Sequence, residues 1–422
     1  MQEDFLHFIW QYQKFSTANL TTVCGKSIQV ITVGTHNVNS GPDFFNSKIS
    51  IDNQLWVGTV ELHIKASDWY VHKHQHDSAY SNVILHVVWE ANDKVYDNYE
   101  NEIVTLELKS IVDVSLVQKY KKLIAQKSWI NCENEIHTVG SFTISNWKEK
   151  LLINRLQRKA EFLEELLCKS QNNWEEVLFI MLAESFGLKI NATQFKLMAK
   201  SISFSVLKKE RVNRTNLEAL FFGQSNLLAG NDVDSYYDEL KKTYTYLKQK
   251  HGLKNSLVKL DFFRLRPANF PTIRLSQLAS LYSENQNLFS KIIVTNQIKD
   301  LYKILTVAAS DYWDIHYTFG NSSIKRKKVL SKSFINVLII NTVIPLKYAY
   351  EKSLGSNEFE KTMSLYAALK SENNSIVNNF KELEVSAESA VDSQALIELK
   401  TQYCDKHKCL HCEIGNKLLN TL

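Results

Sequence analysis

Acidic and imidazole side chains in the first hundred residues have a spacing that could hold a metal ion. Asp43 comes directly before one expected strand, and Glu61, His63 and Lys65 alternate along the next. Because side chains of a strand alternate between its two faces, the last three project together. Two carboxylates at adjacent strand ends are hard oxygen ligands that suit Mg²⁺ or Mn²⁺. We therefore expect Asp43 and Glu61 to bind one of these ions, with His63 or Lys65 positioning a bound water.

A second group of side chains with metal-binding chemistry follows the acidic pair. Five of the 12 histidines lie between residues 63 and 86. Three of them alternate before an acid in SDWYVHKHQHD: His72, His74, His76 and Asp77. Imidazoles with a carboxylate are ligands of zinc, iron and nickel sites. We expect a transition metal if His63 and His86 face the same cavity as the two carboxylates. The other interpretation is an exposed polar excursion, with His86 hydrogen-bonded in the core.

The C-terminal segment CDKHKCLHC has the composition of a metal site. Its cysteines are Cys404, Cys409 and Cys412, and His407 lies between them. Three thiolates and one imidazole form a closed tetrahedral site, so we expect these four residues to bind a structural Zn²⁺. An iron–sulfur cluster is the alternative, and it needs a fourth ligand from elsewhere, such as Cys132. A third interpretation is a helical hairpin without metal, with two of the cysteines packed inward.

The segment RLRPANFPTIRL indicates phosphate binding in the second half of the chain. It places Arg264, Arg266 and Arg274 around two prolines, just before an amphipathic helix. Guanidinium groups on a rigid backbone near a helix N-terminus suit phosphate. We therefore expect these arginines to contact nucleic acid. The alternative is that they pair with Asp261 and neighbouring acids to lock a long connection between helices.

The charge distribution differs between the front and the back of the chain. Residues 1–110 contain seven lysines, no arginine and 13 acidic residues, whereas residues 111–422 contain 43 basic and 32 acidic ones. The acidic front and basic back predict separate roles for the two parts, with nucleic acid as a candidate partner of the basic one. Surface solvation alone is the other explanation for such an imbalance.

The elements that must position these residues change in type along the chain. A helix is predicted over residues 2–14, a strand over 26–33, two strands joined at Asp52-Asn53 over 44–66, a strand over 82–89, and two weaker strands that end at residues 104–108. The sequence pattern changes near residue 145. From there apolar residues recur every three or four positions, which predicts a succession of helices. After the first, these helices are expected at 174–186, 194–207, 234–251, 274–282, 287–307, 332–349 and 358–370. The fold class is therefore α+β: an N-terminal α-β-β-β-α-β mixed sheet over residues 1–110, a linker over 111–144, and an all-α domain over 145–422 that carries the cysteine cluster.

At the acidic residues the sequence resembles the PD-(D/E)xK nuclease superfamily. Pro42-Asp43 matches the first part of that motif, and Glu61-Leu62-His63 matches the second part except at its last position. The resemblance implies a restriction-endonuclease-like sheet, magnesium bound by the two acids, and help from a carboxylate of the first helix, Glu3 or Asp4. A histidine stands where the superfamily has lysine, so Lys65 is the candidate for the missing charge.

The whole chain also resembles an uncharacterised bacterial family, a domain of unknown function. The landmarks of this resemblance are spread over nearly the entire sequence: SGPDF, VELHIKASDW, NVILHVVW, LFFGQ, RLRPANFPTIRL and YCDKHKCLHCEIG. The family implies no activity, so a mechanism depends on the residues themselves.

These observations lead to three functional hypotheses. The first is a Mg²⁺- or Mn²⁺-dependent phosphodiesterase that cleaves nucleic acid at Asp43 and Glu61. The second is a scaffold that keeps a degenerate nuclease fold and binds nucleic acid or protein. The third is a metal hydrolase of other substrates that uses the histidines. Since no run of 18 apolar residues and no secretory leader is present, we expect a cytoplasmic protein without a membrane partner.

Overall fold

The computed structural model describes residues 2–37, 39–125, 128–230, 233–256, 258–355 and 359–420. The chain forms two compact units. Residues 1–147 and 398–422 make the first, which we call the sheet unit, and residues 148–397 make the second, the helical unit. The expected linker lies within the sheet unit, although its residues 126 and 127 fall outside the described ranges. The last part of the chain, expected in the helical domain, belongs to the sheet unit instead.

The sheet unit contains a six-stranded mixed sheet. Its strands run in the order β1-β3-β4-β5-β6, with β2 paired to β3. The first strands pair antiparallel, whereas β4, β5 and β6 are parallel. The bounds are β1 (Ile28–Thr32), β2 (Thr35–His36), β3 (Phe44–Ile51), β4 (Gln54–Lys65), β5 (Val83–Glu90) and β6 (Thr105–Glu107). The mixed sheet and the helices after it confirm the α+β prediction.

Two connections set the topology around β4. Asp52 and Asn53 join β3 to β4 with φ values of 48° and 64°, the two left-handed residues of a tight hairpin. Parallel strands need a longer crossover, and residues 66–82 supply it between β4 and β5. The crossover contains α2 (Asp68–Val71), η1 (His74–His76) and η2 (Ser78–Tyr80).

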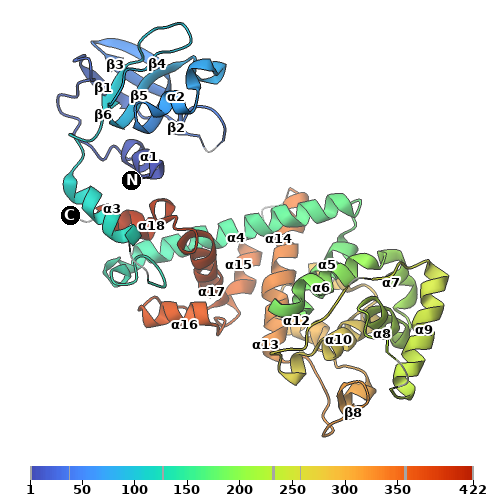
Figure 1. Ribbon diagram of the computed structural model, residues 1–422. Coiled ribbons are helices and arrows are strands. Elements are labelled where there is room, and N and C mark those ends of the chain that lie inside the picture. The colour runs from blue at the N-terminus through green and yellow to red at the C-terminus, as the bar shows by residue number, and fades with distance from the viewer. Residues whose placement is uncertain are drawn as a thin grey trace. The chain divides into compact units, whose positions relative to one another are not determined.

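The two faces of the sheet bury different chemistry. On one face Val60, Leu62, Leu85 and Val87 pack in a core with α1 (Glu3–Gln11), which lies beside the strands in Figure 1. On the other face the alternate positions are polar but equally buried: Glu61, His63 and His86 are 5%, 1% and 0% exposed. A buried polar face requires partners, and the crossover provides them.

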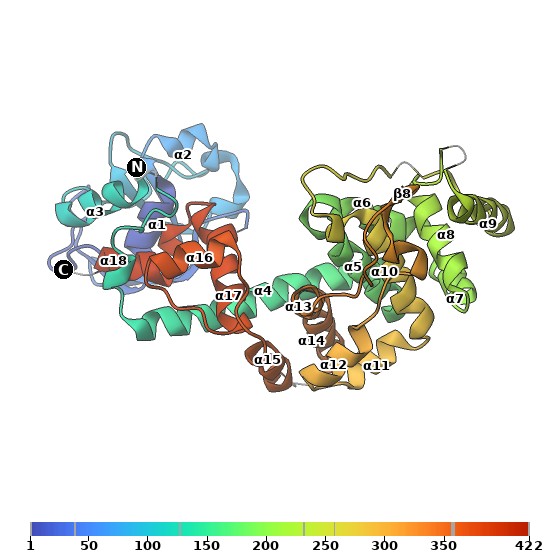
Figure 2. The same cartoon turned by 90° about the horizontal axis from the view of Figure 1, so that it is seen from below.

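The rest of the sheet unit completes the apolar core. Helix α3 (Val114–Ala125) packs on α1, where the rings of Phe5 and Tyr120 stack with centroids 3.9 Å apart. The C-terminal segment adds Leu410 and Leu419 to the same core. It consists of the π-helical turn η7 (Leu399–Cys404), η8 (Cys409–His411) and α18 (Glu413–Asn420). Helix α18 contacts α3, and the two lie near each other in Figure 2.

The helical unit is built around one large apolar core. The unit boundary falls inside the long helix α4 (Ser141–Lys169). The remaining helices are α5 (Trp174–Phe186), α6 (Leu188–Ser201), α7 (Phe204–Glu210), α8 (Arg214–Gln224), α9 (Ser235–His251), α10 (Pro271–Glu284), α11 (Leu288–Val294), α12 (Ile298–Leu305), α13 (Lys332–Leu338), α14 (Ile344–Ser353), α15 (Phe359–Ala367), α16 (Ser375–Glu382) and α17 (Ala390–Glu398). Short elements connect them: η3 (Ile136–Thr138) before α4, then η4 (Pro267–Asn269), η5 (Asp311–Asp314), β7 (His316–Thr318), β8 (Asn321–Ser322) and the π-helical η6 (Ile339–Val343).

One continuous helical stretch among the described residues is long and apolar enough to cross a membrane. It runs from Lys332 to Ser353 through α13, η6 and α14, and 67% of its most apolar window is buried inside the protein. Burial of this kind is also found in a core helix of a globular domain.

Candidate metal centre

The polar face of the sheet and the crossover bring four histidines together. Glu61 and His63 lie two positions apart on β4, and His86 is the partner of Glu61 in the parallel register with β5. The crossover adds His72 at the end of α2 and His74 at the start of η1. Lys73 between them has φ 61°, a left-handed turn that separates the two short helices.

The ligand atoms of this group are spaced as they would be around one cation. Ring nitrogens of His63, His72 and His74 all lie within 4.8 Å of one another. His63 Nε2 is 3.0 Å from His72 Nδ1, and Glu61 Oε1 is 3.4 Å from His74 Nε2 and 3.7 Å from His63 Nε2. Zinc–nitrogen bonds of 2.0–2.1 Å place tetrahedral ligands about 3.3–3.4 Å apart. The ring nitrogens and the Glu61 oxygen are thus separated by distances typical of the ligands of one metal ion.

Surrounding residues hold the imidazole rings in place. His63 Nδ1 lies 2.8 Å from His86 Nε2. A metal-binding histidine commonly uses its second nitrogen in this way, which fixes its tautomer and orientation. Tyr80 stacks on His74 at 3.8 Å between centroids, and Trp69 packs at 5.3 Å from His74 and 5.5 Å from His86. The group is therefore preorganised by aromatic neighbours.

Burial keeps the imidazoles of His63 and His86 neutral. It lowers the pKa of His63 to about 2, with the neighbouring His86 and His74 contributing, and it lowers the pKa of His86 to about 3. Neutral imidazole is the form that binds metal. His74 Nε2 is buried without a hydrogen-bond partner. A buried nitrogen without a partner is costly, and a bound cation would satisfy it.

The carboxylates of Asp43 and Glu61, the two predicted metal ligands, each accept a hydrogen bond from a backbone amide at the point where the pairing of β3 and β4 is interrupted. The Asp43 amide donates to Glu61 Oε2 at 3.1 Å, and the Leu62 amide donates to Asp43 Oδ2 at 2.9 Å. Burial, followed by the charge of Asp43, raises the pKa of Glu61 to about 9. Glu61 thus holds a proton near neutral pH, and a cation at its Oε1 would replace that proton.

The first helix contributes a histidine that the sequence analysis missed. His7 Nε2 lies 3.2 Å from Asp43 Oδ2. Burial lowers the pKa of His7, but the hydrogen bond and charge of Asp43 outweigh burial, so its pKa is raised. Glu3, one turn earlier on the same helix face, has its pKa raised by burial while the charge of His72 opposes the shift. Asp4 instead lines a separate hollow beside His407.

A second missed residue, Asn37, shapes the loop before Asp43. Its side-chain amide donates to the carbonyls of Asn39, Ser40 and Pro42 at 3.1 Å each. Asparagine often organises turns through such local bonds. In the sequence Asn37 stands seven positions before Phe44, the last residue of the SGPDF motif. Only this proximity indicated its role.

Other predicted residues of the sheet unit lie outside the group. Lys65 is exposed at the end of β4, and its amide binds Asp68. His76 is exposed, and Asp77 caps η2 through the amide of Ala79. The alternating run of histidines therefore divides: two of its members face the sheet, and the third faces outward.

The three arginines of the helical unit have different surroundings. Arg264 and Arg266 are exposed. Arg274 is only 5% exposed, and its terminal nitrogens donate to Gln277 at 2.8 Å and Asn269 at 2.6 Å. Burial lowers its pKa to about 10. Arg274 is therefore a core residue that cannot reach a surface phosphate, whereas the other two can.

The cysteines are arranged differently from the predicted zinc site. Cys404, Cys409 and Cys412 line one cavity together with Cys132. His407 is exposed, has φ 53° and lines the separate hollow next to Asp4. The fourth side chain at the cysteine cavity is thus Cys132 rather than His407.

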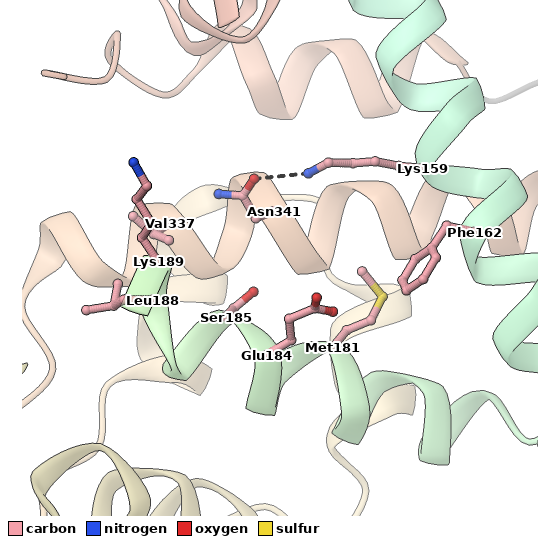
Figure 3. Close-up of a pocket in the computed structure, with 9 residues that line it drawn as sticks. All are labelled: Lys159, Phe162, Met181, Glu184, Ser185, Leu188, Lys189, Val337 and Asn341. Atoms are coloured by element: carbon pink, nitrogen blue, oxygen red, sulfur yellow. Dashed lines mark hydrogen bonds between the residues drawn. The ribbon is translucent and has the colours of Figure 1, made fainter. Parts of the chain in front are cut away.

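The helical unit contains a cavity of its own, of about 410 Å³. Helices α4, α5 and α6 line it together with residues of α13 and η6. Figure 3 shows Glu184 and Met181 of α5 on one side and Lys159 of α4 bonded to Asn341, at 3.0 Å, on the other. Its size suits a small molecule. Because the lining comes from several separate helices, no local sequence pattern predicts it.

Residues 3–375 match the model of a family described as a protein of unknown function, DUF2851. The match includes all the residues of the histidine group and stops before Cys404. Comparisons with curated proteins and with solved structures returned no match.

Proposed function

Because the chain belongs to the DUF2851 family, whose description names no activity, we propose a function from the site alone: a metal-dependent hydrolase of phosphodiesters. Glu61, His63, His72 and His74 hold one transition-metal ion, and Asp43 with His7 lies beside it. The observation that supports this proposal is the convergence of three ring nitrogens on a cation-sized space, with a carboxylate oxygen of Glu61 close to two of them.

The donor set favours a transition metal over Mg²⁺. Imidazole nitrogens suit zinc, iron, copper and nickel, whereas magnesium prefers oxygen ligands and water. Three of the four donors are imidazoles, and one oxygen of each carboxylate already accepts a backbone N–H. Zn²⁺ is our first candidate, and Mn²⁺ and Fe²⁺ are the next.

The protein's own groups fit the needs of hydrolysis. A bound metal ion would lower the pKa of a coordinated water and polarise the substrate. The Asp43–His7 pair supplies proton transfer, since Asp43 raises the pKa of His7 and thereby strengthens it as a base. Asp43 is itself fixed by the Leu62 amide. His72, the exposed member of the group, marks the side from which a substrate would enter.

A phosphodiester is the substrate class best supported by the sequence. The chain has the element order and the partial motif that resemble the PD-(D/E)xK superfamily, and the residues after 110 carry an excess of basic charge. Exposed Arg264 and Arg266 are suitable contacts for a nucleic-acid backbone. A histidine-bound metal ion here takes the place of the magnesium ion and the lysine of the superfamily.

Metal binding is tested first, by titrating metal-stripped protein with Zn²⁺, Mn²⁺, Fe²⁺ and Mg²⁺ in a calorimeter. We expect one tight Zn²⁺ per chain at this centre, weaker Mn²⁺ and no measurable Mg²⁺. His74→Ala removes a ligand and should weaken binding at least about 100-fold. His76→Ala, two residues away but exposed, is the matched control and should bind as the wild type does. Equal affinity of the two variants would exclude this ligand set.

Activity is tested with the metal-loaded protein on single- and double-stranded DNA and RNA and on a small aryl phosphodiester. We expect cleavage by the wild type and by His76→Ala, and a loss of at least about 100-fold in kcat for His74→Ala and Asp43→Asn. Tight metal binding without cleavage of any phosphodiester would reject the phosphodiesterase proposal.

One observation favours a second candidate, a hydrolase of a small uncharged substrate. The groups in contact with the histidines are carboxylates and the rings of Trp69 and Tyr80, and Lys65 is exposed rather than facing them. Such surroundings bind a negatively charged substrate least favourably. Turnover of neutral ester or amide substrates by the wild type, lost in His74→Ala, would support this candidate over the phosphodiesterase.

A further inference from the structure

Four of the six cysteines lie around one cavity of the sheet unit. Cys132 comes from the segment between α3 and η3, whereas Cys404, Cys409 and Cys412 come from the C-terminal segment. Leu123 lines the same small cavity. Residues that far apart in sequence converge here because both segments pack on the same apolar core.

The sulfurs have the environment of buried ligands. Burial, followed by the charges of neighbouring cysteines, raises the pKa of Cys132 to about 12, and burial raises the pKa of Cys412 to about 11. The Asn131 side-chain amide donates to Cys409 Sγ at 3.5 Å. Backbone N–H groups of Ile414 and Gly415 donate to Cys412 and oppose the rise of its pKa. Such N–H donors stabilise a thiolate once a metal replaces its proton.

The spacing of the sulfurs argues against a single zinc ion. Zn–S bonds of 2.3 Å place tetrahedral sulfurs about 3.8 Å apart. Among the residues that the structure describes, no three of the cysteine sulfurs lie within 4.8 Å of one another, a distance that the three imidazoles of the histidine group do satisfy. In a polynuclear cluster several iron and sulfide atoms lie between the ligand sulfurs, so these sulfurs are farther apart than they are around one zinc ion.

We propose that Cys132, Cys404, Cys409 and Cys412 bind an iron–sulfur cluster. The site is separate from the histidine group and does not depend on the proposed hydrolase function. Lys408 lines the cavity and supplies a positive charge beside the four thiolates.

The cluster would join the two segments of the sheet unit. Residues 398–420 return to this unit after 250 residues of helical unit, and Cys132 is their thiol partner on the earlier segment. A metal centre that forms only in the folded state adds its binding free energy to folding. The cluster therefore holds the C-terminal segment in place.

The experiment is anaerobic isolation of the full-length protein from iron-supplemented cells, followed by iron, zinc and acid-labile sulfide analysis. We expect iron and sulfide in equal amounts, with visible absorption from thiolate-to-iron charge transfer and an electron paramagnetic resonance signal after reduction. The readout needs no variant, so it holds even if a cysteine substitution prevents folding. Zinc without sulfide, or no metal at all, would overturn the proposal.

Variants then test the ligand set. In Cys132→Ser, iron and sulfide should fall at least about tenfold. Cys168→Ser, an exposed cysteine on α4, and His407→Ala are the matched controls and should keep the full content. Circular dichroism of each variant separates loss of the cluster from loss of the fold. If His407→Ala lost the iron and Cys132→Ser kept it, the proposed ligand set would be excluded.

Discussion

At the scale of single residues, Arg274 shows that a basic side chain in a motif can serve the core. Its guanidinium group lies 3.6 Å from the ring centroid of Phe334 and donates to Asn269 and Gln277. Stacking and two side-chain hydrogen bonds hold its terminal nitrogens without an acid, whereas its Nε is buried without a hydrogen-bond partner among the described residues. Neither the phosphate contact nor the ion pair considered from the sequence describes this residue.

This geometry predicts that Arg274 and its exposed neighbours behave differently. Arg274→Met should lower the free energy of unfolding of the helical unit by about 2–4 kcal/mol, because two buried amides lose their donor. The double variant Arg264→Ala/Arg266→Ala should unfold as the wild type does, and should reduce the salt dependence of nucleic-acid affinity by about two phosphate contacts. Chemical denaturation and a salt titration of binding measure the two effects. Unchanged stability of Arg274→Met would contradict the structural role.

A buried acid in the helical unit predicts a pH dependence of its stability. Glu218 on α8 is 1% exposed, and burial raises its pKa although Ser276 and Tyr236 donate to its oxygens. The folded protein therefore keeps a proton that the unfolded chain loses above about pH 4.3. Because the folded state binds more protons, its stability falls as the pH rises from there through the raised pKa.

Glu218→Gln should remove this part of the pH dependence. The free energy of unfolding of the wild type should decline with pH relative to the variant, by about 1.4 kcal/mol for each pKa unit separating the folded and unfolded states. Glu239→Gln changes an exposed acid on α9 and should follow the wild-type curve. Denaturation curves measured at a series of pH values from about 4 upward provide the measurement, and an identical pH dependence of Glu218→Gln and wild type would refute the prediction.

The candidate site shows which residue roles a sequence can predict. Alternation along β4 correctly placed Glu61 and His63 on one face, because the period of a strand is a local property. The contacts of His7 and Asn37, and the separation of His74 from His76, depend on how α1 and the crossover meet the sheet. Those are tertiary contacts, and single-sequence patterns carry no information about them.

At the scale of elements, Gly415 allows α18 to pack closely against the backbone of Cys409, beside the cysteine cavity. A Cβ at Gly415 would lie 2.2 Å from the carbonyl oxygen of Cys409, closer than any real contact. Since Cys409 and Cys412 flank this approach, Gly415→Ala should displace one of them. We expect a loss of about 1–3 kcal/mol in the stability of the sheet unit and faster reaction of its thiols with a thiol reagent.

Gly140 offers the matched control for this prediction. A Cβ at Gly140, just before α4, would meet nothing within 4 Å. Gly140→Ala should therefore leave stability unchanged or slightly higher, because alanine restricts the unfolded chain. Equal thiol reactivity in Gly415→Ala and Gly140→Ala would show that the close approach at Gly415 has no effect on the cavity.

Element boundaries were predicted less well than element types. The periodic segment 194–207 is divided between α6 and α7 because Ser203 caps α7, its hydroxyl accepting from the Val206 amide. The segment 287–307 likewise divides into α11 and α12. Strands of two or three residues, such as β2 and β7, are too short to show an alternating pattern. Helix α5 was predicted at its observed bounds, whereas α4 and α10 each begin three or four residues before the predicted start.

At the scale of the whole molecule, the sheet unit depends on a segment far from the rest of its sequence. Deleting residues 398–422 removes Leu410 and Leu419 from the core that includes α1 and α3. We expect faster amide hydrogen exchange in both helices, and unchanged exchange in α10 of the helical unit. Cys168→Ser changes an exposed side chain of α4 and is the control, which should exchange as the wild type does. Protection of α1 and α3 in the deletion would contradict the assignment of this segment.

The overall class was predictable, but this division of the chain was not. Composition and periodicity distinguish a sheet-rich front from a helical back, and these are properties of local sequence. The C-terminal segment is helical like the residues before it, so its pattern matches the helical unit. Only its contacts with α1 and α3 place it with the sheet.

The return of the last segment to the sheet unit affects how the protein is made. Translation proceeds from the N-terminus and domains fold as they leave the ribosome. All residues of the helical unit have emerged once residue 397 is free, while the sheet unit still lacks its final helix. The first 147 residues must therefore stay free of aggregation until the segment from residue 398 onward has emerged, and chaperone dependence should be concentrated in that interval.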